Sequence, residues 1–569
     1  MTIAKQELAM ARDSGPSKVE QVKLASHGLR GTLAEEVHNN APTFSGASGT
    51  LLKFHGIYQG YDRDSATELK QKGLGKQAQL MVRVRIPGGR LTAAQYLALD
   101  ELADRHGNGT LRLTTRQSIQ FHGVLKRDSH AAIAGINRAL LTTLAACGDV
   151  VRTVTTVPAP IRDAVHARLE ADARRLSAHL LPQSHAYHEI WLDGEPVAGE
   201  AEETLYGRSY LPRKFKIGLA TPEDNSIDVL TNDLGIVALF EGDVLAGYNL
   251  ALGGGLGMTH NNPRTFPRLA SPVAFVAPED LLPAAEAVVR LHRDHGDRAD
   301  RRHARLKYLI AEHGEAWAKA RLEEYLGKPL EVPRPMPRFQ VPDHLGWHEQ
   351  GDGRLYLGVP VPSGRLAGQA RQALRQAIAR FGADPIISPS QDLILSNVAP
   401  QDRPAIEALL RSGGIALVQD VTPVRRWSLA CPALPTCGLA LTEAERVHDP
   451  LIGGIEAALA RHGLEHERLA VRITGCPNGC ARPYAGDIGI VGRMPGYYAL
   501  YVGGDFEGTR LNFRLLDRVA ESEVATTLEP LFALFARERL PGEGFGDFCQ
   551  RAGKVRLIGA LGVALQEVS

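Results

Sequence analysis

Alternating hydrophobic and polar residues predict β-strands in the first third of the chain. Residues 79–92 and 111–123 each follow the period of two that sends successive side chains to opposite faces of a sheet. A helix-like stretch at 93–107 separates these strands, and residues 147–158, rich in Thr and Val, are expected to form a third. The pattern therefore favours a fold that mixes strands and helices.

The same pattern predicts further elements downstream. An amphipathic helix is expected at 161–182, followed by strands at 186–195 and 210–220. Residues 283–325 are a charged helical region whose four histidines we expect on a solvated face. The proline-rich residues 328–342 are expected to form a linker, which divides the chain into two parts.

Positively charged side chains recur at alternate positions of the expected strands, so that Arg83 and Arg85 share one face. Arginines on an inward face cost free energy unless an anion pairs with them. The strands therefore indicate either a solvated face with ion pairs or an anion-binding site. Besides Arg83, the candidates are Arg112 and Arg116, which share a face with Thr114, then His122, Arg152, Lys214 and Lys216.

Beyond residue 340 the motifs of the first half of the chain return in the same order. RIPGGRL at 85–91 returns as PVPSGRL at 360–366, and DLGIV at 233–237 returns as DIGIV at 487–491. An ordered series of this kind indicates a gene duplication that produced two half-chains related by a pseudo-twofold axis. A cofactor between two such halves would take ligands from both.

The repeat also suggests a division of labour between the halves. The first half keeps the cations, whereas the second has cysteines where the first has Val157 and its neighbours. One half would then recognise an anion while the other holds a redox centre. The aligned pairs are Arg152 with Arg426, Val157 with Cys431, Gln117 with Gln391, and Lys214 with Arg472.

Four of the six cysteines fall in one window, as C-x5-C at Cys431 and Cys437 and as C-x3-C at Cys476 and Cys480. Four thiolates from two loops can hold one soft metal centre. The long step in the first pair suits the tight knuckles of structural zinc poorly, whereas four cysteines are the ligand set of a 4Fe-4S cluster. The spacing favours an iron–sulfur cluster and leaves zinc and unligated cysteines as alternatives.

Composition narrows the class of protein. Hydrophobic residues make up 44% and charged residues 23%, which is ordinary for a globular protein, and the formal net charge of +1 argues against a bulk nucleic-acid or membrane binder. Six cysteines in 569 residues exclude a disulfide scaffold and fit a reducing compartment. The N-terminal residues form no apolar leader and no run is long enough to span a membrane, so the expected location is the cytoplasm.

These cysteine and cation motifs resemble those of the sulfite and nitrite reductase haemoproteins, which carry a 4Fe-4S cluster bridged to a sirohaem. The resemblance covers nearly the whole chain, from LLKFHGIYQGYDRD at 51–64, and LRGTLAEE before it, to GEGFGDF at 542–548. It implies an α+β fold in duplicated halves, with two ferredoxin-like lobes and two larger mixed-sheet lobes around a central cofactor.

The resemblance also implies roles for individual residues. It makes the four clustered cysteines the ligands of the 4Fe-4S cluster, and Cys480 the axial ligand of the sirohaem iron as well. Thr153 stands where relatives commonly have Asn, a departure that we expect to tune the haem pocket. The positions that match the family's substrate-binding cations are Arg83, Arg152, Lys214 and Lys216, and those near the sirohaem are Arg112, Arg116, His122 and Gln391.

The activity implied by the resemblance is the six-electron reduction of sulfite to hydrogen sulfide in cysteine biosynthesis, by the haemoprotein (beta) subunit of an NADPH-dependent assimilatory sulfite reductase. The chain has no complete G-x-G-x-x-G fingerprint, so the electrons are expected to come from another protein. The resemblance implies that this is a separate flavoprotein subunit with FAD and FMN, within a hetero-oligomer. The alternatives are a ferredoxin-dependent sulfite or nitrite reductase with the same cofactors, and a non-catalytic zinc protein. The identity of the electron donor distinguishes a ferredoxin-dependent reductase from the NADPH-dependent enzyme. Metal analysis distinguishes a zinc protein from both.

The expected domain boundaries follow the repeat and the linker. Residues 1–25 are expected to be either a disordered leader or a surface for a partner subunit. The boundaries are an N-terminal arm and lead-in at 1–75, a ferredoxin-like lobe at 76–160, a larger lobe at 161–340, a second ferredoxin-like lobe at 341–425, and the cysteine-bearing larger lobe at 426–569.

Overall fold

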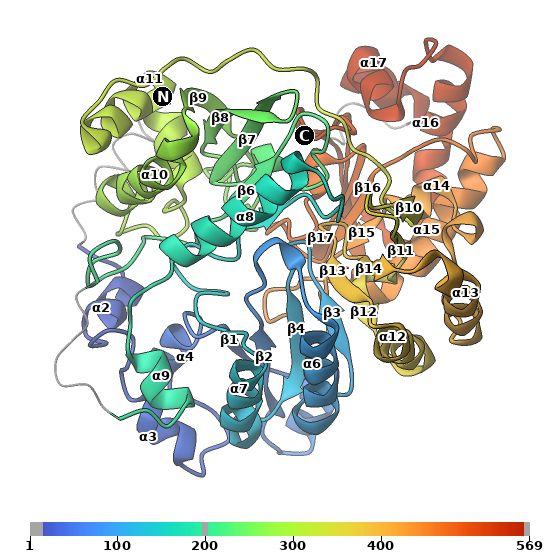
Figure 1. The fold of residues 1–569 in the computed structure, drawn as a ribbon. Helices are drawn as coiled ribbons and strands as arrows, with labels where there is room; N and C mark the ends of the chain where they lie inside the picture. The colour runs from blue at the N-terminus through green and yellow to red at the C-terminus, as the bar shows by residue number, and fades with distance from the viewer. Residues whose placement is uncertain (1–14, 196–202, 563–569) are drawn as a thin grey trace.

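In the computed structural model, which describes residues 15–195 and 203–562, the chain forms four β-sheets with helices packed around them. Figure 1 shows two smaller lobes, blue and yellow, lying next to each other below two larger lobes, green and orange to red. The expected α+β class with duplicated lobes is confirmed.

The first ferredoxin-like lobe is an antiparallel sheet in the order β1-β2-β4-β3-β12. Because β1 begins at Ile57, this sheet starts earlier in the chain than residue 76. Helix α6 begins with a capping box, in which Thr92 and Gln95 each accept a hydrogen bond from the other's backbone N–H. The elements are β1 (Ile57–Tyr61), β2 (Ala78–Arg83), α6 (Ala93–His106), β3 (Leu111–Leu113), β4 (Ile119–Val124) and α7 (Ser129–Arg138).

The second ferredoxin-like lobe has the strand order β10-β11-β14-β13. Its short strand β12 (Arg365–Leu366) crosses over to pair with β3 of the first lobe, and Arg90 of the first lobe forms a bridge with Ile386 in return. This reciprocal exchange interlocks the two halves. The elements are β10 (Gly346–Glu349), β11 (Leu355–Val359), α12 (Gly368–Phe381), β13 (Asp384–Ile387), β14 (Leu393–Val398) and α13 (Arg403–Ser412).

The two larger sheets repeat one topology, with parallel pairing between the first three strands and antiparallel pairing after them. Leu429 pairs with Arg472 as Thr155 pairs with Gly218, so the predicted match of Val157 with Cys431 agrees with this register. The strands are β5 (Thr155–Thr156), β6 (Ile217–Ala220), β7 (Leu234–Glu241), β8 (Val244–Leu252) and β9 (Ser271–Val276) in the first half, and β15 (Leu429–Ala430), β16 (Val471–Thr474), β17 (Ile488–Met494), β18 (Tyr497–Val502) and β19 (Phe513–Ala520) in the second.

Helices cover these sheets and form the N-terminal lead-in. They are α2 (Lys18–Leu24), α3 (Leu33–His38), α4 (Gly46–Leu51), α5 (Ala66–Gln71), α8 (Ala164–His179), α9 (Ala186–Trp191), α10 (Leu281–His295) and α11 (Leu306–Leu326), then α14 (Pro423–Arg426), α15 (Glu445–Ala460), α16 (Val524–Glu538) and α17 (Phe545–Ala560). None of the helices in the described part of the chain is both long and apolar enough to cross a membrane.

The N-terminal helix α2 is part of the folded protein. Lys23 is buried and donates a hydrogen bond to the carbonyl of Leu211 at 2.7 Å, and its ammonium also pairs with the buried Glu20. The expectation that residues 1–25 form a disordered leader is therefore wrong for the part that contains α2. Residues 1–14 lie outside the described part of the chain.

Three sequence predictions are corrected by the structure. Residues 111–123 are not one strand but a hairpin of β3 and β4, because Gln117 takes the left-handed conformation (φ 51°) and reverses the chain. Residues 186–195 are not a strand, because the buried side chains from Ala186 to Trp191 recur with helical spacing in α9. His292 in α10 is fully buried rather than solvated.

The strand register corrects one aligned pair. Gly218 pairs with Gly235 as Arg472 pairs with Gly489, so the counterpart of Arg472 in the first half is Gly218 and not Lys214. The motif alignment slipped by four positions because it rested on short shared motifs such as KIG at 216–218, whereas the strand register fixes each residue by its paired neighbours.

Hydrophobic side chains form two main cores. The larger core joins both ferredoxin-like lobes to the first larger sheet, and the second core fills the cysteine-bearing lobe from Val424 to Ile558. The half-chains are thus not two separate globules. Sharing a core fixes the cation-bearing strands of one half relative to the cysteine loops of the other.

Candidate functional site

The four clustered cysteines lie on two loops that leave neighbouring parallel strands. Cys431 follows β15, Cys476 and Cys480 follow β16, and the Cys431 N–H donates to the carbonyl of Ile473 at 3.1 Å. The Gly475 N–H donates to Cys431 Sγ at 3.4 Å, which ties one loop to the other. Parallel strands present their C-terminal ends at one edge, so both loops open in the same direction.

The four thiols lie close enough to influence one another's charge. Burial first, and then the negative charge of Cys480, raises the pKa of the Cys431, Cys437 and Cys476 thiols. Within residues 15–195 and 203–562, no three His, Cys, Asp or Glu side chains are grouped so as to hold a single metal ion. Four neighbouring cysteines match the ligand number of a 4Fe-4S cluster.

The candidate cations come together on the other half of the molecule. Lys214 and Lys216 flank Phe215, whose carbonyl accepts from the Arg152 N–H at 3.0 Å and whose N–H donates to the carbonyl of Val150 at 3.1 Å. These backbone bonds fix the two lysines beside Arg152. Among the described residues, neither lysine ammonium has a hydrogen-bond or ion-pair partner.

Burial and neighbouring positive charges lower the pKa of both lysines, as expected where an anion is to be bound. Burial, followed by the positive charges of Arg213 and Arg152, lowers the pKa of Lys214 well below its ordinary value. Burial and then the charge of Arg116 lower the pKa of Lys216 to about 7. The negative charge of Cys480 acts on Lys216 in the opposite direction, so this lysine faces the cysteine loops as well as the cations.

Arg116 links the cations to the larger sheet. Its guanidinium donates to Asn232 Oδ1 at 2.6 Å, to the carbonyl of Thr153 at 2.6 Å and to that of Ile217 at 2.9 Å. Burial and the nearby charge of Arg482 lower its pKa to about 9, and its buried Nε has no acceptor among the described atoms. Arg116 therefore keeps one donor free for a ligand.

Arg83 and Arg152 lie in the same group, whereas Arg85 does not. Both Arg83 and Arg152 lower the pKa of Arg116 by their charge, although its burial is the larger cause. Arg152 donates to the Tyr58 hydroxyl at 3.2 Å, a contact that no sequence motif indicated. Arg85 instead donates to Ser177 and to the carbonyls of Ala145 and Val151, so of the expected pair only Arg83 lies with the other cations.

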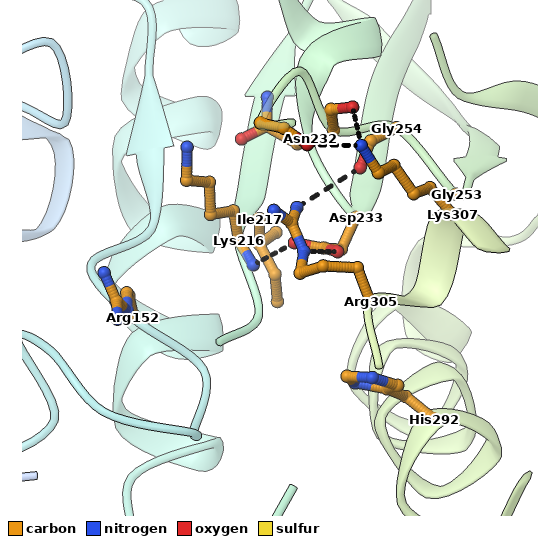
Figure 2. Close-up of polar contacts among 12 residues, drawn as sticks. Arg152, Lys216, Ile217, Asn232, Asp233, Gly253, Gly254, His292, Arg305 and Lys307 are labelled. Atoms are coloured by element: carbon orange, nitrogen blue, oxygen red, sulfur yellow. Dashed lines mark hydrogen bonds and ion pairs between the residues drawn. The ribbon is translucent and has the colours of Figure 1, made fainter. Parts of the chain in front are cut away.

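Further charged residues, Asp233, Arg305 and Lys307, lie near Lys216 (Figure 2). Asp233 accepts the Lys216 backbone N–H at 2.9 Å and binds Arg305 through both oxygens, at 2.9 and 2.8 Å. Figure 2 shows the Lys216 side chain extending away from this carboxylate. Lys307 donates to the carbonyls of Gly255 and Gly257 at 3.0 and 2.7 Å, and so holds the glycine-rich loop.

The remaining sequence candidates are bound to protein groups. Arg112 forms an ion pair with Glu445 and donates to the carbonyl of Ala430 at 2.7 Å, directly before Cys431. Arg365 contacts His122 Nδ1 at 3.2 Å. Gln391 Nε2 donates to the carbonyl of Ser363 at 3.4 Å, and its buried Oε1 has no partner among the described atoms. Their roles near a sirohaem remain predictions.

Sequence reasoning missed several residues of this site. Asp233 was visible only as the first letter of the repeated DLGIV motif, and Arg305 and Lys307 lay in a region assigned to a charged helix. No local pattern marks a side chain whose partners are remote in sequence. The other residues missed are Tyr58, Asp228, Arg365, Glu445, Arg472 and Arg482.

Comparisons with known proteins agree with this geometry. The family "Nitrite and sulphite reductase 4Fe-4S domain" matches residues 171–330 and 425–567, and the "Nitrite/Sulfite reductase ferredoxin-like half domain" matches residues 74–139 and 348–413. The two matches to each family reproduce the duplication seen in the sheets.

Individual relatives extend the similarity along the chain. The chain is 47% identical to the sulfite reductase (NADPH) hemoprotein beta-component of Myxococcus xanthus over 546 residues, covering 95% of this chain and 97% of the relative. It is 44% identical to the sulfite reductase (ferredoxin) of Synechococcus elongatus, covering 94% and 89%. The solved structure of the Mycobacterium tuberculosis NirA protein has the same fold, with a TM-score of 0.78, 24% identity, and coverage of 95% of this chain and 98% of that one.

Proposed function

Because the chain belongs to the nitrite and sulphite reductase family, we propose that it is the haemoprotein subunit of an assimilatory sulfite reductase, which reduces sulfite to hydrogen sulfide with six electrons. The observation that carries this proposal is the group of partly unpartnered cations opposite four electrostatically linked cysteines. Such a site can bind an oxyanion next to a redox centre, and a structural zinc protein would not need it.

The residues present fit the two cofactors of the family. Cys431, Cys437, Cys476 and Cys480 would hold the 4Fe-4S cluster, and Cys480 would also ligate the sirohaem iron. The carboxylates of a sirohaem would provide an acceptor for Arg116 Nε, which has none among the described atoms. When bound, the cofactors supply electrons one at a time to the substrate.

The chain's own part in the reaction is to bind the oxyanion and deliver protons. Two unit charges about 4 Å apart interact by roughly 4 kcal/mol at an effective dielectric constant of about 20, so several cations together offset the desolvation of a dianion. Arg83 and Arg152 suit this role because a guanidinium can contact two oxygens at once. Lys214 and Lys216 suit proton delivery because burial among cations lowers their pKa.

The pH dependence of turnover should follow the protonation state of Lys216. With its pKa near 7, Lys216 carries a proton below this pH and loses it above, so kcat/KM should fall as the pH rises through about 7. A bound anion raises this pKa, and kcat should therefore fall at a higher pH than kcat/KM. Initial rates of the wild type and of Lys216→Arg across this range measure the effect. Sulfite's own ionisation affects both proteins equally, so identical profiles would exclude Lys216 as the titrating group.

We also propose that the electrons come from NADPH through a separate flavoprotein subunit, and that the complex works in the cytoplasm. The relative from Myxococcus xanthus is named as a beta-component, which supports a second subunit, whereas the relative from Synechococcus elongatus is named for ferredoxin. The cysteines of the described chain are all free thiols, as in a reducing compartment. Sulfite-dependent NADPH oxidation that requires an added flavoprotein would support this donor, and turnover with reduced ferredoxin alone would favour the alternative.

A further inference from the structure

One carboxylate of the first half is bound to both ends of the second cysteine loop. This loop, residues 474–480, is preceded by Arg472 in β16 and followed by Arg482. Asp228 Oδ2 accepts from Arg472 Nη1 at 2.6 Å and lies 2.8 Å from Arg482 Nε. All three side chains are buried, so these are ion pairs inside the interface between the halves.

The duplication explains how this contact arose. Asp228 precedes the short helix η3 (Val229–Thr231), and Arg482 precedes its counterpart η8 (Pro483–Ala485). Both residues take the left-handed conformation, with φ of 49° and 58°. They therefore occupy equivalent positions and meet across the pseudo-twofold axis. Two aspartates or two arginines at these positions would repel each other, whereas Asp228 and Arg482 attract each other.

A matching exchange of small and large residues makes room for Arg472. Arg472 and Gly486 of the second half correspond to Gly218 and Asn232 of the first. A Cβ on Gly486 would lie 3.0 Å from Arg472 Cδ, and a Cβ on Gly218 would lie 2.7 Å from Asn232 Nδ2. In the first half the free space holds Asn232, the partner of Arg116. In the second half it lets Arg472 reach Asp228.

Further contacts make this junction rigid. Arg482 donates to the carbonyl of Ile227 at 3.3 Å and to that of Pro389 at 3.2 Å, while Arg472 donates to the carbonyl of Arg482 at 3.3 Å. The middle of the loop is held by the glycine-rich segment, because the Met258 N–H donates to the carbonyl of Pro477 at 2.9 Å. Asp228 thus binds both ends of the loop, and the glycine-rich segment binds its middle.

We propose that Asp228 is a positioning residue that clamps the loop bearing Cys476 and Cys480 through Arg472 and Arg482. A carboxylate is otherwise out of place between halves whose shared site is rich in cations, and this pairing accounts for its presence. The clamp holds two of the expected cluster ligands in register with Cys431 and Cys437 of the other loop. The inference rests on the proposed function only in taking the four cysteines as the cluster ligands.

The test uses purified holoprotein and Asp228→Asn, which removes the charge but keeps the shape. Outer partners of metal ligands typically change metal affinity roughly 10- to 100-fold when they are mutated. We therefore expect the variant to lose its cluster to an iron chelator roughly 10- to 100-fold faster than the wild type, with an altered electron paramagnetic resonance signal of the reduced cluster. The wild-type rate and signal in Asp228→Asn would overturn the proposal.

Asp100→Asn is the matched control. Asp100 is also a buried carboxylate that joins the halves, since it pairs with Arg371 at 2.6 Å between α6 and α12. Its partners in the described part of the chain are Arg371 and Arg375, and neither of them belongs to the cysteine loop. This control should lower thermal stability without changing the cluster signal or its rate of loss. A control that loses its cluster as fast as Asp228→Asn would overturn the proposal, because general destabilisation would then suffice.

A milder variant covers the case in which Asp228→Asn does not fold. Arg472→Met leaves Asp228 paired with Arg482, so only one end of the loop is released. Faster cluster loss with unchanged secondary structure supports the clamp, and wild-type cluster retention in this variant contradicts it. None of these measurements uses sulfite. A wild-type protein that holds its cluster but reduces no sulfite would refute the proposed function and leave the clamp standing.

Discussion

Replacing Lys216 by methionine should lower sulfite turnover at least about 100-fold while both cofactors stay bound, because a positioned general acid typically contributes about 100- to 10,000-fold. Methionine has a similar length and is uncharged, so the site keeps its shape and loses only the proton donor. The Lys216 ammonium has no hydrogen-bond or ion-pair partner among the described residues, and it lies near Arg116, Arg305 and Cys480. Its removal should therefore disturb little else.

Two further variants separate proton delivery from simple charge. Lys216→Arg keeps the positive charge but holds its proton far more tightly, so KM should stay close to that of the wild type while kcat falls. Lys126→Met changes another lysine with a buried stem, which donates to Asn39 and to the carbonyl of Ala41 away from the site, and should leave turnover unchanged. Wild-type kcat in Lys216→Arg would show that charge alone suffices.

Serine at any of the four clustered cysteines should abolish the 4Fe-4S cluster and with it all sulfite reduction. Burial, and then the charges of neighbouring cysteines, raise the pKa of the Cys431, Cys437 and Cys476 thiols, so a bound cationic centre is what allows these three to ionise. Iron and acid-labile sulfide per chain, measured after purification without oxygen, should fall to background in each variant.

Cys549→Ser is the control for this series. Cys549 is fully buried in the same hydrophobic core as Cys431, so its replacement perturbs packing at least as much as the other substitutions. This variant should keep its iron and sulfide. If a serine variant of the four retained a full cluster, or if Cys549→Ser lost it, the assignment of the ligands would be wrong.

The sequence predicted the architecture better than the local elements. The repeated motifs located the duplication because equivalent strands keep their hydrophobic pattern, and the register of Thr155 and Leu429 agrees with it. The hairpin at 111–123 was misread as one strand because its turn is made by Gln117, a residue without the usual turn signal. The helix α9 was misread because six residues are too few to show a helical period.

Some residues of the site could be recognised in the sequence, whereas others could not. Cysteines and strand-borne cations carry their chemistry in their residue type and spacing, so they were recognisable in the sequence. Asp228 and Arg482 were not, because each is meaningful only as the other's partner across the pseudo-twofold axis, and 254 positions separate them in the chain. The exchange of Gly218 and Asn232 for Arg472 and Gly486 likewise appears only when the strands are paired in space.

The central claim is that this chain reduces sulfite at a site made by its two halves. The most direct test supplies reduced methyl viologen to the purified, cofactor-loaded protein and offers sulfite and nitrite separately, with analysis of the products. We expect sulfide to form efficiently from sulfite, whichever protein is the natural donor. Ammonia from nitrite with little sulfide would move the chain to the nitrite reductases, and a colourless protein that forms neither product would contradict the account.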